Sequence, residues 1–431
     1  MSDLMEKVYQ AFDPGPLGGD ADLDKLYVDL DDVRGRADVV NRLANKIRLS
    51  DTPTCQVLAG HKGSGKSTEL RRLQRQLETA TKRYFVVFCD SDEDIDRNDV
   101  DFLEVLIAIM RQTSIHLREE AGIKLKPGYF RDRWERIWNL LGSKVELDSV
   151  ELEAGFATIS TTVKASPDAR LRLRELIEND TGNWLHAAND LIGDAVLKLK
   201  KKGYHGLVVL VDDLDKIVLR PHHKAGCSTG EYLFVHREAQ LSAFGCHTVY
   251  TMPLALAYSP LEATIAGLYG GQVPIVPMVK INEPPPKGGD CVAGLEKCRE
   301  IVRRRLESAG TNVGDVFDSA ETLDMLIRFT GGQPTELMYF AREALITSFP
   351  ITAEAVGRPV RERRKAYARQ LRAEHWPIIN EVRKSGRFTR TEQTDEAIRD
   401  LLDSRAVLQY ANDGEWYAVN PVIESEPSSP T

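Results

Sequence analysis

The stretch VLAGHKGSGKSTEL at residues 57–70 constrains the fold of this chain more than any other segment. A short apolar run leads into the spacing Gly60-x-x-x-x-Gly65-Lys66-Ser67, and a pattern typical of a helix follows it. This spacing between a strand and a helix is that of a phosphate-binding loop. Glycine permits backbone angles that turn successive N–H groups toward an anion, and the helix N-terminus adds positive potential. The sequence therefore predicts a nucleotide site on a strand, loop and helix.

Within this loop, the chemistry of each polar side chain predicts its task. We expect Lys66 to reach the β- and γ-phosphates and to act in catalysis, and the Ser67 hydroxyl to ligate Mg²⁺. ATP or ADP with Mg²⁺ is the expected ligand. The loop residues expected to contact it are Gly60, His61, Lys62, Gly63, Ser64, Gly65, Lys66, Ser67 and Thr68.

A second acidic motif, GLVVLVDDLDK at residues 206–216, supplies the expected partner of this loop. Its unbroken apolar run is typical of a strand that is buried on both faces, and ligands bind at the carboxyl ends of such strands. We expect Asp212 to hold Mg²⁺ and Asp213 to act as the base that orients the attacking water.

Further segments complete an α/β fold. Apolar runs at 83–92, 246–253 and 273–281 read as strands, and helical patterns lie near 99–119, 184–202 and 231–244. This alternation predicts a three-layer sandwich, a parallel sheet with helices on both faces. Thr251, at the end of the fourth strand, can offer a hydroxyl near the γ-phosphate, although an ordinary strand-end threonine explains it equally well.

Composition agrees with a soluble protein of several parts. The chain has 431 residues, 42% of them hydrophobic, and a net charge of −8, so it can bury two cores and does not attract nucleic acid over its whole surface. No apolar run approaches the ~20 residues that span a bilayer. The six cysteines show no Cys-x-x-Cys spacing and read as reduced thiols, and the N-terminus lacks a signal pattern. These features indicate a cytoplasmic protein with no membrane attachment.

Changes in composition suggest the domain limits. We expect an N-terminal segment at 1–24, a P-loop core at 25–282 with an insertion at 120–183, and an α-helical lid at 283–350. A basic linker helix at 351–375, a small winged-helix domain at 376–423 and a disordered tail at 424–431 follow. The linker NEPPPKGGD at 282–290 can continue neither strand nor helix. Lid helices are expected at 291–309, 319–330 and 334–348.

The insertion carries an aromatic stripe and then an alternating segment. One helical face holds Phe130, Trp134, Ile137, Trp138 and Leu141. A local core is the expected role of this stripe, with a surface for a partner as the alternative. Residues 145–163 alternate in a way that predicts a hairpin or edge strand.

A nearby loop raises the question of zinc. His222, His223 and Cys227 lack a fourth nearby ligand, so a flexible loop near the nucleotide is favoured over a zinc site.

The recognition-position helix of the expected winged-helix domain is acidic. It carries Glu392, Asp395, Glu396, Asp400 and Asp403, which repel DNA phosphates. A packing or partner module is therefore favoured over a DNA reader. The basic stretch at 358–376 is the better nucleic-acid candidate, although a solvated charged face explains it as well, and any binding is expected to be weak.

The chain resembles ATPases of the AAA+ and STAND group, near the origin-recognition and NACHT-like branches. The motifs YVDLDDVRGRADVVNRLANKI, the phosphate loop, VVLVDDLDK, HTVYTMP and GGQPTELMYFAREAL occur in the order of that group over about residues 25–350. The resemblance implies nucleotide roles for residues 60–67, Asp212, Asp213 and Thr251. It further implies that Pro334, in the Gly332-x-Pro334 turn of the lid, touches the nucleotide.

Departures from the AAA+ pattern favour a switch over a motor. The segment SPLEATIAGLYGG, after the fourth strand, contains no arginine for a neighbouring subunit's site, and the lid helix begins with Thr335 and Glu336 where AAA+ members place an arginine. Arg342 lies too far along that helix to replace it. Asp213 is one CH₂ shorter than the commoner glutamate, and a displacement of about 1 Å lowers rates by ~10²-fold, so hydrolysis is expected to be slow.

Three functional classes follow. The first is a regulatory switch ATPase that controls a separately encoded effector or sensor protein, in a bacterial antiphage or stress system for example, with homo-oligomers also compatible. The second is an origin-recognition-like AAA+ ATPase acting on DNA. The third, an enzyme that modifies a small substrate, finds no second catalytic constellation in the sequence.

Overall fold

A five-stranded parallel sheet organises the N-terminal two thirds of the chain. The computed structural model describes residues 3–35, 38–125, 136–137, 152–178, 180–222, 226–411 and 414–424. The strands, in the order β2-β3-β4-β1-β5, are β2 (Phe85–Asp90), β3 (Leu207–Asp212), β4 (His247–Pro253), β1 (Cys55–Gly60) and β5 (Ile275–Val276). Because β1, β4 and β3 run parallel, the phosphate loop after β1 and the acidic motif after β3 open at the same edge of the sheet. The predicted α/β fold with a parallel sheet is confirmed.

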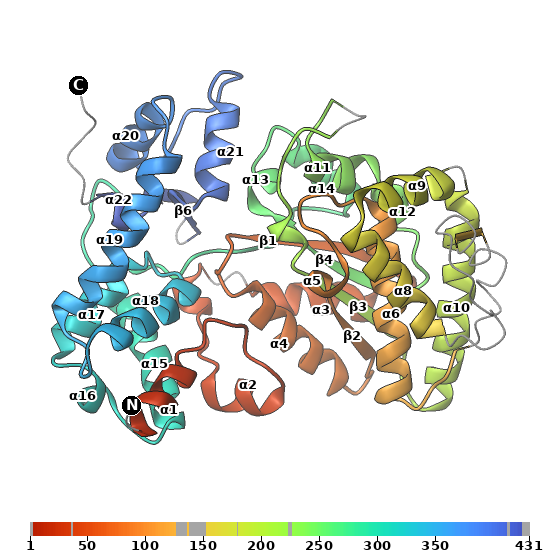
Figure 1. The fold of residues 1–431 in the computed structure, drawn as a ribbon, viewed down its shortest axis with the longest axis horizontal. Coiled ribbons are helices and arrows are strands. Elements are labelled where there is room, and N and C mark those ends of the chain that lie inside the picture. The colour runs from red at the N-terminus through yellow and green to blue at the C-terminus, as the bar shows by residue number, and fades with distance from the viewer. Residues whose placement is uncertain are drawn as a thin grey trace.

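Helices cover both faces of the sheet, as Figure 1 shows. Successive residues of a strand belong to different apolar clusters. Val86 packs with α3 (Val39–Leu49) and α4 (Lys66–Glu78), and Val87 packs with the helices of the opposite face. These helices are α6 (Phe102–Glu119), α8 (Leu152–Ala165), α9 (Pro167–Glu178) and α10 (Thr181–Lys201). This alternation is the period of two that a strand imposes, and it produces three layers.

The expected hairpin in the insertion is wrong. The described part of that segment forms α8, whose Phe156, Ile159 and Val163 are buried in the cluster that contains α6. Their spacing of three and four residues is that of one helical face, and packing on α6 selects it over the alternating interpretation. Of the aromatic stripe, Ile137 is buried, and Phe130, Trp134, Trp138 and Leu141 lie outside the described residues.

The predicted strand at 273–281 pairs with β1 only over β5. Beyond it, three successive backbone N–H groups donate to carbonyls of three different segments. Met278 donates to Gln409 (3.2 Å), Val279 to Gly332 (3.1 Å) and Lys280 to Val33 (2.9 Å). The chain therefore leaves the sheet here and becomes a seam between the core, the lid and the C-terminal residues.

The lid contains the three expected helices, each within one residue of its predicted bounds. They are α15 (Val292–Ser308), α17 (Ala320–Phe329) and α18 (Pro334–Thr347), with α16 (Val313–Val316) between the first two and the basic α19 (Ala353–Gln370) following. The linker at 282–290 is a closed loop, because Asn282 bridges to Asp290 and Asp290 pairs with Arg328 at 2.7 Å.

The C-terminal unit, residues 375–424, consists of helices and a hairpin. Its elements are α20 (His375–Ser385), α21 (Asp395–Asp403), β6 (Val407–Tyr410), β7 (Trp416–Val419) and α22 (Pro421–Glu424). The antiparallel pairing of β6 with β7 confirms the predicted hairpin. Glu424, expected to begin a disordered tail, ends α22, and residues 425–431 lie outside the described ranges.

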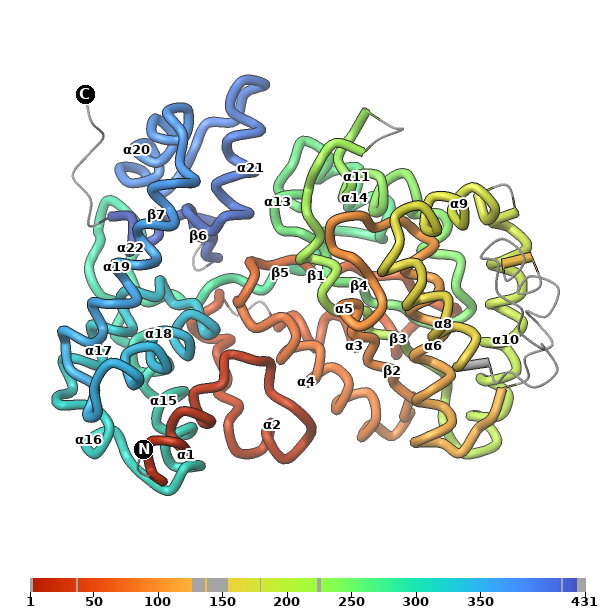
Figure 2. Tube along the Cα trace, in the orientation of Figure 1, coloured from red at the N-terminus to blue at the C-terminus, as the bar shows by residue number. Residues whose placement is uncertain are grey.

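Residues 3–26, the N-terminal segment, form α1 (Asp3–Ala11) and α2 (Asp20–Leu26) and lie beside the lid in Figure 2. One apolar cluster contains side chains of this segment, the lid and the C-terminal unit, including Val8, Phe340 and Ile398. These three parts therefore share a core.

The remaining elements are short. They are the 3-10 turns Asp31–Val33 and Leu214–Lys216, α5 (Ser91–Asp94), α11 (Thr229–Glu231), a π-helical turn (Tyr232–His236), α12 (Glu238–Leu241), α13 (Leu254–Ala257) and α14 (Glu262–Leu268). In the part of the chain that the structure describes, no helix has the length and apolar character needed to cross a membrane.

Candidate nucleotide site

The phosphate loop joins β1 to α4 and has the backbone that its glycines permit. Gly60, Gly63 and Gly65 have φ of 155°, 81° and 98°. A Cβ on Gly63 would lie 2.5 Å from Nε2 of Gln333 in the lid, so this position needs glycine both for its backbone angle and for the approach of the lid. The loop is therefore shaped for an anion and closely covered from the lid side.

Lys66 is buried and held by three oxygen atoms. Its Nζ donates to the carbonyls of Gly60 (2.9 Å) and His61 (2.7 Å) and pairs with Oδ2 of Asp215 at 2.9 Å. Sequence reasoning did not single out Asp215, and its only signal was a third acidic residue in VDDLDK. Asp215 and the two carbonyls hold the ammonium beside the loop.

Three carboxylates gather after β3. Oxygen atoms of Asp212, Asp213 and Asp215 lie within 4.8 Å of one another. Burial, with the nearby charges of Asp213 and Asp215, raises the pKa of Asp212 to about 6, while a hydrogen bond from the Ser67 side chain lowers it. Crowded buried carboxylates with an adjacent hydroxyl fit a hard divalent cation, so Ser67 and Asp212 would hold Mg²⁺. When bound, the ion neutralises charge on the phosphates.

Asp213 lies at the edge of this cluster. Its φ is 67°, and its carboxylate pairs with Nζ of Lys216 at 2.6 Å and lies 3.8 Å from Nη2 of Arg97. Two cations therefore orient the side chain that is expected to act as the base, and this role stays a prediction.

Thr251 lies behind the acidic cluster. Its side chain is fully buried, and Oγ1 accepts a long hydrogen bond from the Asp215 N–H at 3.4 Å. It is not among the residues that line the pocket between the loop and the lid. In this structure it supports the Asp215 backbone.

A pocket of about 380 Å³ lies between the loop and the lid. This volume is in the range of small-molecule sites. The residues that line it are Pro14, Gly15, Pro16, Gly63, Gly65, Lys66, Ser67, Thr68, Asp213, Asp215, Lys216, Ile301, Arg305, Pro334, Thr335 and Met338. The structure thus brings Pro334 to the loop.

Two predicted loop residues point elsewhere. The ring of His61 accepts a hydrogen bond from the Gln409 N–H, and Nζ of Lys62 pairs with Asp403. Their side chains therefore contact the C-terminal unit instead of the nucleotide pocket.

Arg34 is a buried loop contact that sequence reasoning missed. Its Nη2 donates to the carbonyl of Ser64 and its Nη1 pairs with Glu69 at 3.2 Å. Its position just before Gly35 in the VRGR stretch was the available signal. Arg34 fixes the loop backbone from the side of the N-terminal residues.

The parallel sheet, the glycine loop after β1 and the aspartates after β3 together give this chain the fold of a P-loop ATPase. No family model matches the sequence, and no curated protein matches it. Among solved structures it is similar to the Walker-type ATPase PABY2304 of Pyrococcus abyssi, at 15% identity and a TM-score of 0.47, over 96% of this chain and 98% of that chain.

Proposed function

We propose that this chain is a regulatory switch that binds ATP, hydrolyses it slowly and controls a partner protein. The observation that carries this proposal is the set of contacts that the lid and the C-terminal unit make with the phosphate loop. Nε2 of Gln333 donates to the carbonyl of Lys62 at 2.7 Å, and the Thr335 N–H donates to that of Gly63 at 3.4 Å. A change in the loop backbone would therefore alter these hydrogen bonds to the lid.

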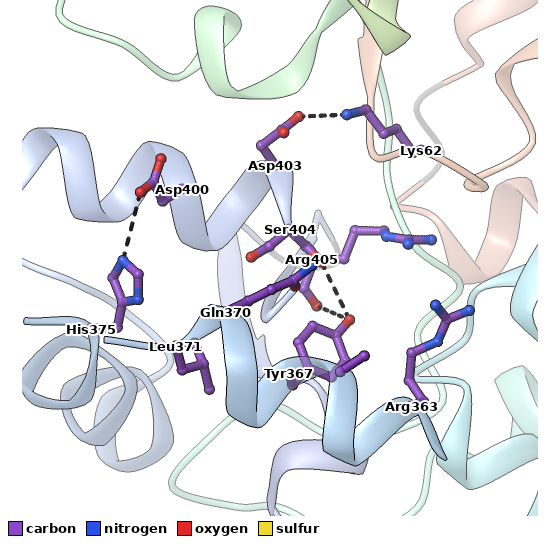
Figure 3. Close-up of a pocket in the computed structure, with 11 residues that line it drawn as sticks. Lys62, Arg363, Tyr367, Gln370, Leu371, His375, Asp400, Asp403, Ser404 and Arg405 are labelled. Carbon is purple, nitrogen blue, oxygen red and sulfur yellow. Dashed lines mark hydrogen bonds and ion pairs between the residues drawn. The ribbon is translucent and has the colours of Figure 1, made fainter. Parts of the chain in front are cut away.

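The C-terminal unit contacts the same loop. The Gln409 N–H donates to Nε2 of His61 at 2.9 Å, and Nζ of Lys62 pairs with Oδ1 of Asp403 at 2.9 Å. Figure 3 shows Lys62 reaching Asp403 at the edge of a cavity of about 410 Å³ that α19 and the C-terminal unit also line. A ligand shifts a two-state equilibrium only when it binds the two states with different affinity. Because the lid and the C-terminal unit touch the phosphate loop, a nucleotide in the loop can bind more tightly when these contacts are made than when they are broken, or the reverse.

Action on DNA is the less favoured function. The acidic α21 packs against α13 of the core, and its Asp400 and Asp403 pair with Arg372 and Lys62. Because α21 packs against the core and is rich in carboxylates, it is poorly suited to enter a DNA groove. We expect only weak DNA binding that depends on α19 and falls steeply with salt, and nanomolar duplex binding at physiological salt would favour the DNA-acting alternative.

The test compares the full chain loaded with ADP and with a non-hydrolysable ATP analogue by hydrogen exchange. We expect the two states to differ at residues 283–350 and in the C-terminal unit. Pro334→Ala should reduce this difference more than it reduces nucleotide affinity. Identical exchange in both states, together with fast multiple turnover, would contradict the switch.

The partner belongs to the same proposal. The lid and the C-terminal unit both contact the phosphate loop, so we propose that a separately encoded effector or sensor binds on their surface. An antiphage or stress role is one setting for such a pair. Recovery of one defined partner whose binding depends on the nucleotide state would support this part.

A further inference from the structure

The N-terminal segment contributes three residues to the nucleotide pocket. Residues 14–16, Pro-Gly-Pro, line it together with Ile301 and Arg305 of α15 and Met338 of α18. We infer that this segment is a part of the binding site, in which residues 14–16 and the lid form the wall for the base and Arg305 holds that wall. The inference rests on the proposed nucleotide binding and deepens it.

The lining of the pocket falls into two chemical sets. The loop residues, Lys66 and the aspartates suit phosphates and a metal ion. Pro14, Pro16, Ile301 and Met338 offer apolar surface of the kind that packs on a flat ring. Because the phosphates belong at the glycine loop, the apolar set is left for the base.

Arg305 joins this wall to the lid. Its Nη1 donates to the carbonyls of Ala11 (2.9 Å) and Asp13 (3.0 Å), immediately before Pro14. Phe12, between those two carbonyls, is fully buried in the core shared with the lid. Arg305 is therefore a positioning residue as well as part of the pocket lining.

Two further arginines extend these attachments. Nε of Arg342 in α18 donates to the carbonyl of Tyr9 at 3.1 Å, and its guanidinium lies 4.1 Å from the centre of the Tyr9 ring. Nη1 of Arg304 donates to the carbonyl of Tyr27, just beyond α2. The N-terminal segment is thus fixed to the lid on both sides of residues 14–16.

The second helix of the segment contacts the core. Arg75 belongs to α4, the helix that begins at Lys66. Its Nη1 lies 2.5 Å from Oδ1 of Asp24 in α2, and its Nε lies 3.7 Å from Oδ1 of Asp20. Figure 1 shows the segment running from the lid helices toward α4. The N-terminal segment therefore contacts both the lid and the core, whose relative position the proposed switch would change.

Gly15 and Pro16 also line a second hollow. This hollow has a volume of about 680 Å³, and Arg305 lines it as well. Gly15, Pro16 and Arg305 therefore border both cavities.

The test separates the base from the phosphates. Affinities of the full chain for ATP and for inorganic tripolyphosphate, each with Mg²⁺, are measured by calorimetry. We expect Arg305→Gln to weaken ATP by about tenfold and to leave tripolyphosphate unchanged. Arg303→Gln is the matched control, because the ion pairs of this exposed neighbour within the described residues are with Glu300 and Glu307 on its own helix. It should change neither affinity.

Other outcomes are decisive as well. Arg305→Gln with wild-type ATP affinity, or with equal weakening of both ligands, would overturn the inference. In the wild type, ATP should slow exchange of the amides at residues 11–17 more than tripolyphosphate does, and equal protection would also overturn it. Failure of the proposed nucleotide binding is distinct, because then Lys66→Ala would alter neither affinity.

Discussion

The backbone N–H of Gln409 donates to Nε2 of His61 at 2.9 Å, across 348 positions of sequence. His61 lies inside the phosphate loop, and Gln409 lies in β6 of the C-terminal unit. Burial, together with the charges of Lys66 and Arg405, lowers the pKa of His61 to about 3. The ring is therefore neutral at physiological pH and able to accept this hydrogen bond.

A loss of stability in mild acid follows from that pKa. A histidine in the unfolded chain titrates near 6.5, above its folded value, so its contribution is present above pH 6.5 and is lost as the pH falls toward 3. Between pH 7 and pH 5 this amounts to about 2 kcal/mol in the free energy of unfolding. We expect denaturant unfolding of the wild type to show this extra loss relative to His61→Gln. Parallel pH profiles for the two proteins would contradict it.

Lys66→Ala should weaken ATP binding by about 100-fold, since it removes the charged hydrogen-bond donor nearest the phosphates. Calorimetry with Mg²⁺ and ATP measures this directly. Lys62→Ala is the control from the same loop, because Lys62 points to Asp403. Lys62→Ala should change ATP affinity far less, by no more than about 1 kcal/mol, the most that its partly exposed pair with Asp403 can contribute. Unchanged affinity in Lys66→Ala would remove the assignment of the phosphate loop.

Asp213→Asn should lower the rate of ATP hydrolysis by about 10²-fold and preserve nucleotide affinity, since its carboxylate is expected to act on water and that of Asp212 on the metal ion. Single-turnover hydrolysis and calorimetry on the same preparation separate the two effects. If turnover is unaffected, another carboxylate of the cluster, such as Asp215, is the base.

The ion pair between Lys62 and Asp403 should contribute little to global stability and more to the position of α21. Both side chains are about a third exposed, at 31% and 38%, so solvent screens the pair and its coupling should be at most about 1 kcal/mol. A double-mutant cycle with alanine at both positions measures that coupling. Hydrogen exchange in α21 should rise in each single variant. A coupling energy well above about 1 kcal/mol would contradict this prediction and show that the pair is a main contribution to stability.

The sheet, the phosphate loop, the acidic motif and the lid helices could be predicted from the sequence, because the residue spacing and hydrophobic pattern within a short segment indicate each of them. It failed at residues 145–163, where the described part is helical and only packing on α6 distinguishes a helical face from an alternating strand. It also overextended the strand at 273–281, because the backbone partners of Met278, Val279 and Lys280 lie in three distant segments.

The sequence by itself determined the local chemistry of this protein. Glycines at 60, 63 and 65 permit the loop, and five apolar residues before Asp212 place its carboxylate at the end of a buried strand. Only the tertiary structure decided that His61 and Lys62 face the C-terminal unit, that Asp215 holds Lys66, and that the N-terminal segment lines the pocket. Lys62 and Gln333, or Asp13 and Arg305, are 271 and 292 positions apart. No local preference encodes such contacts, because they form when the lid, the core and the termini bury their apolar surfaces together.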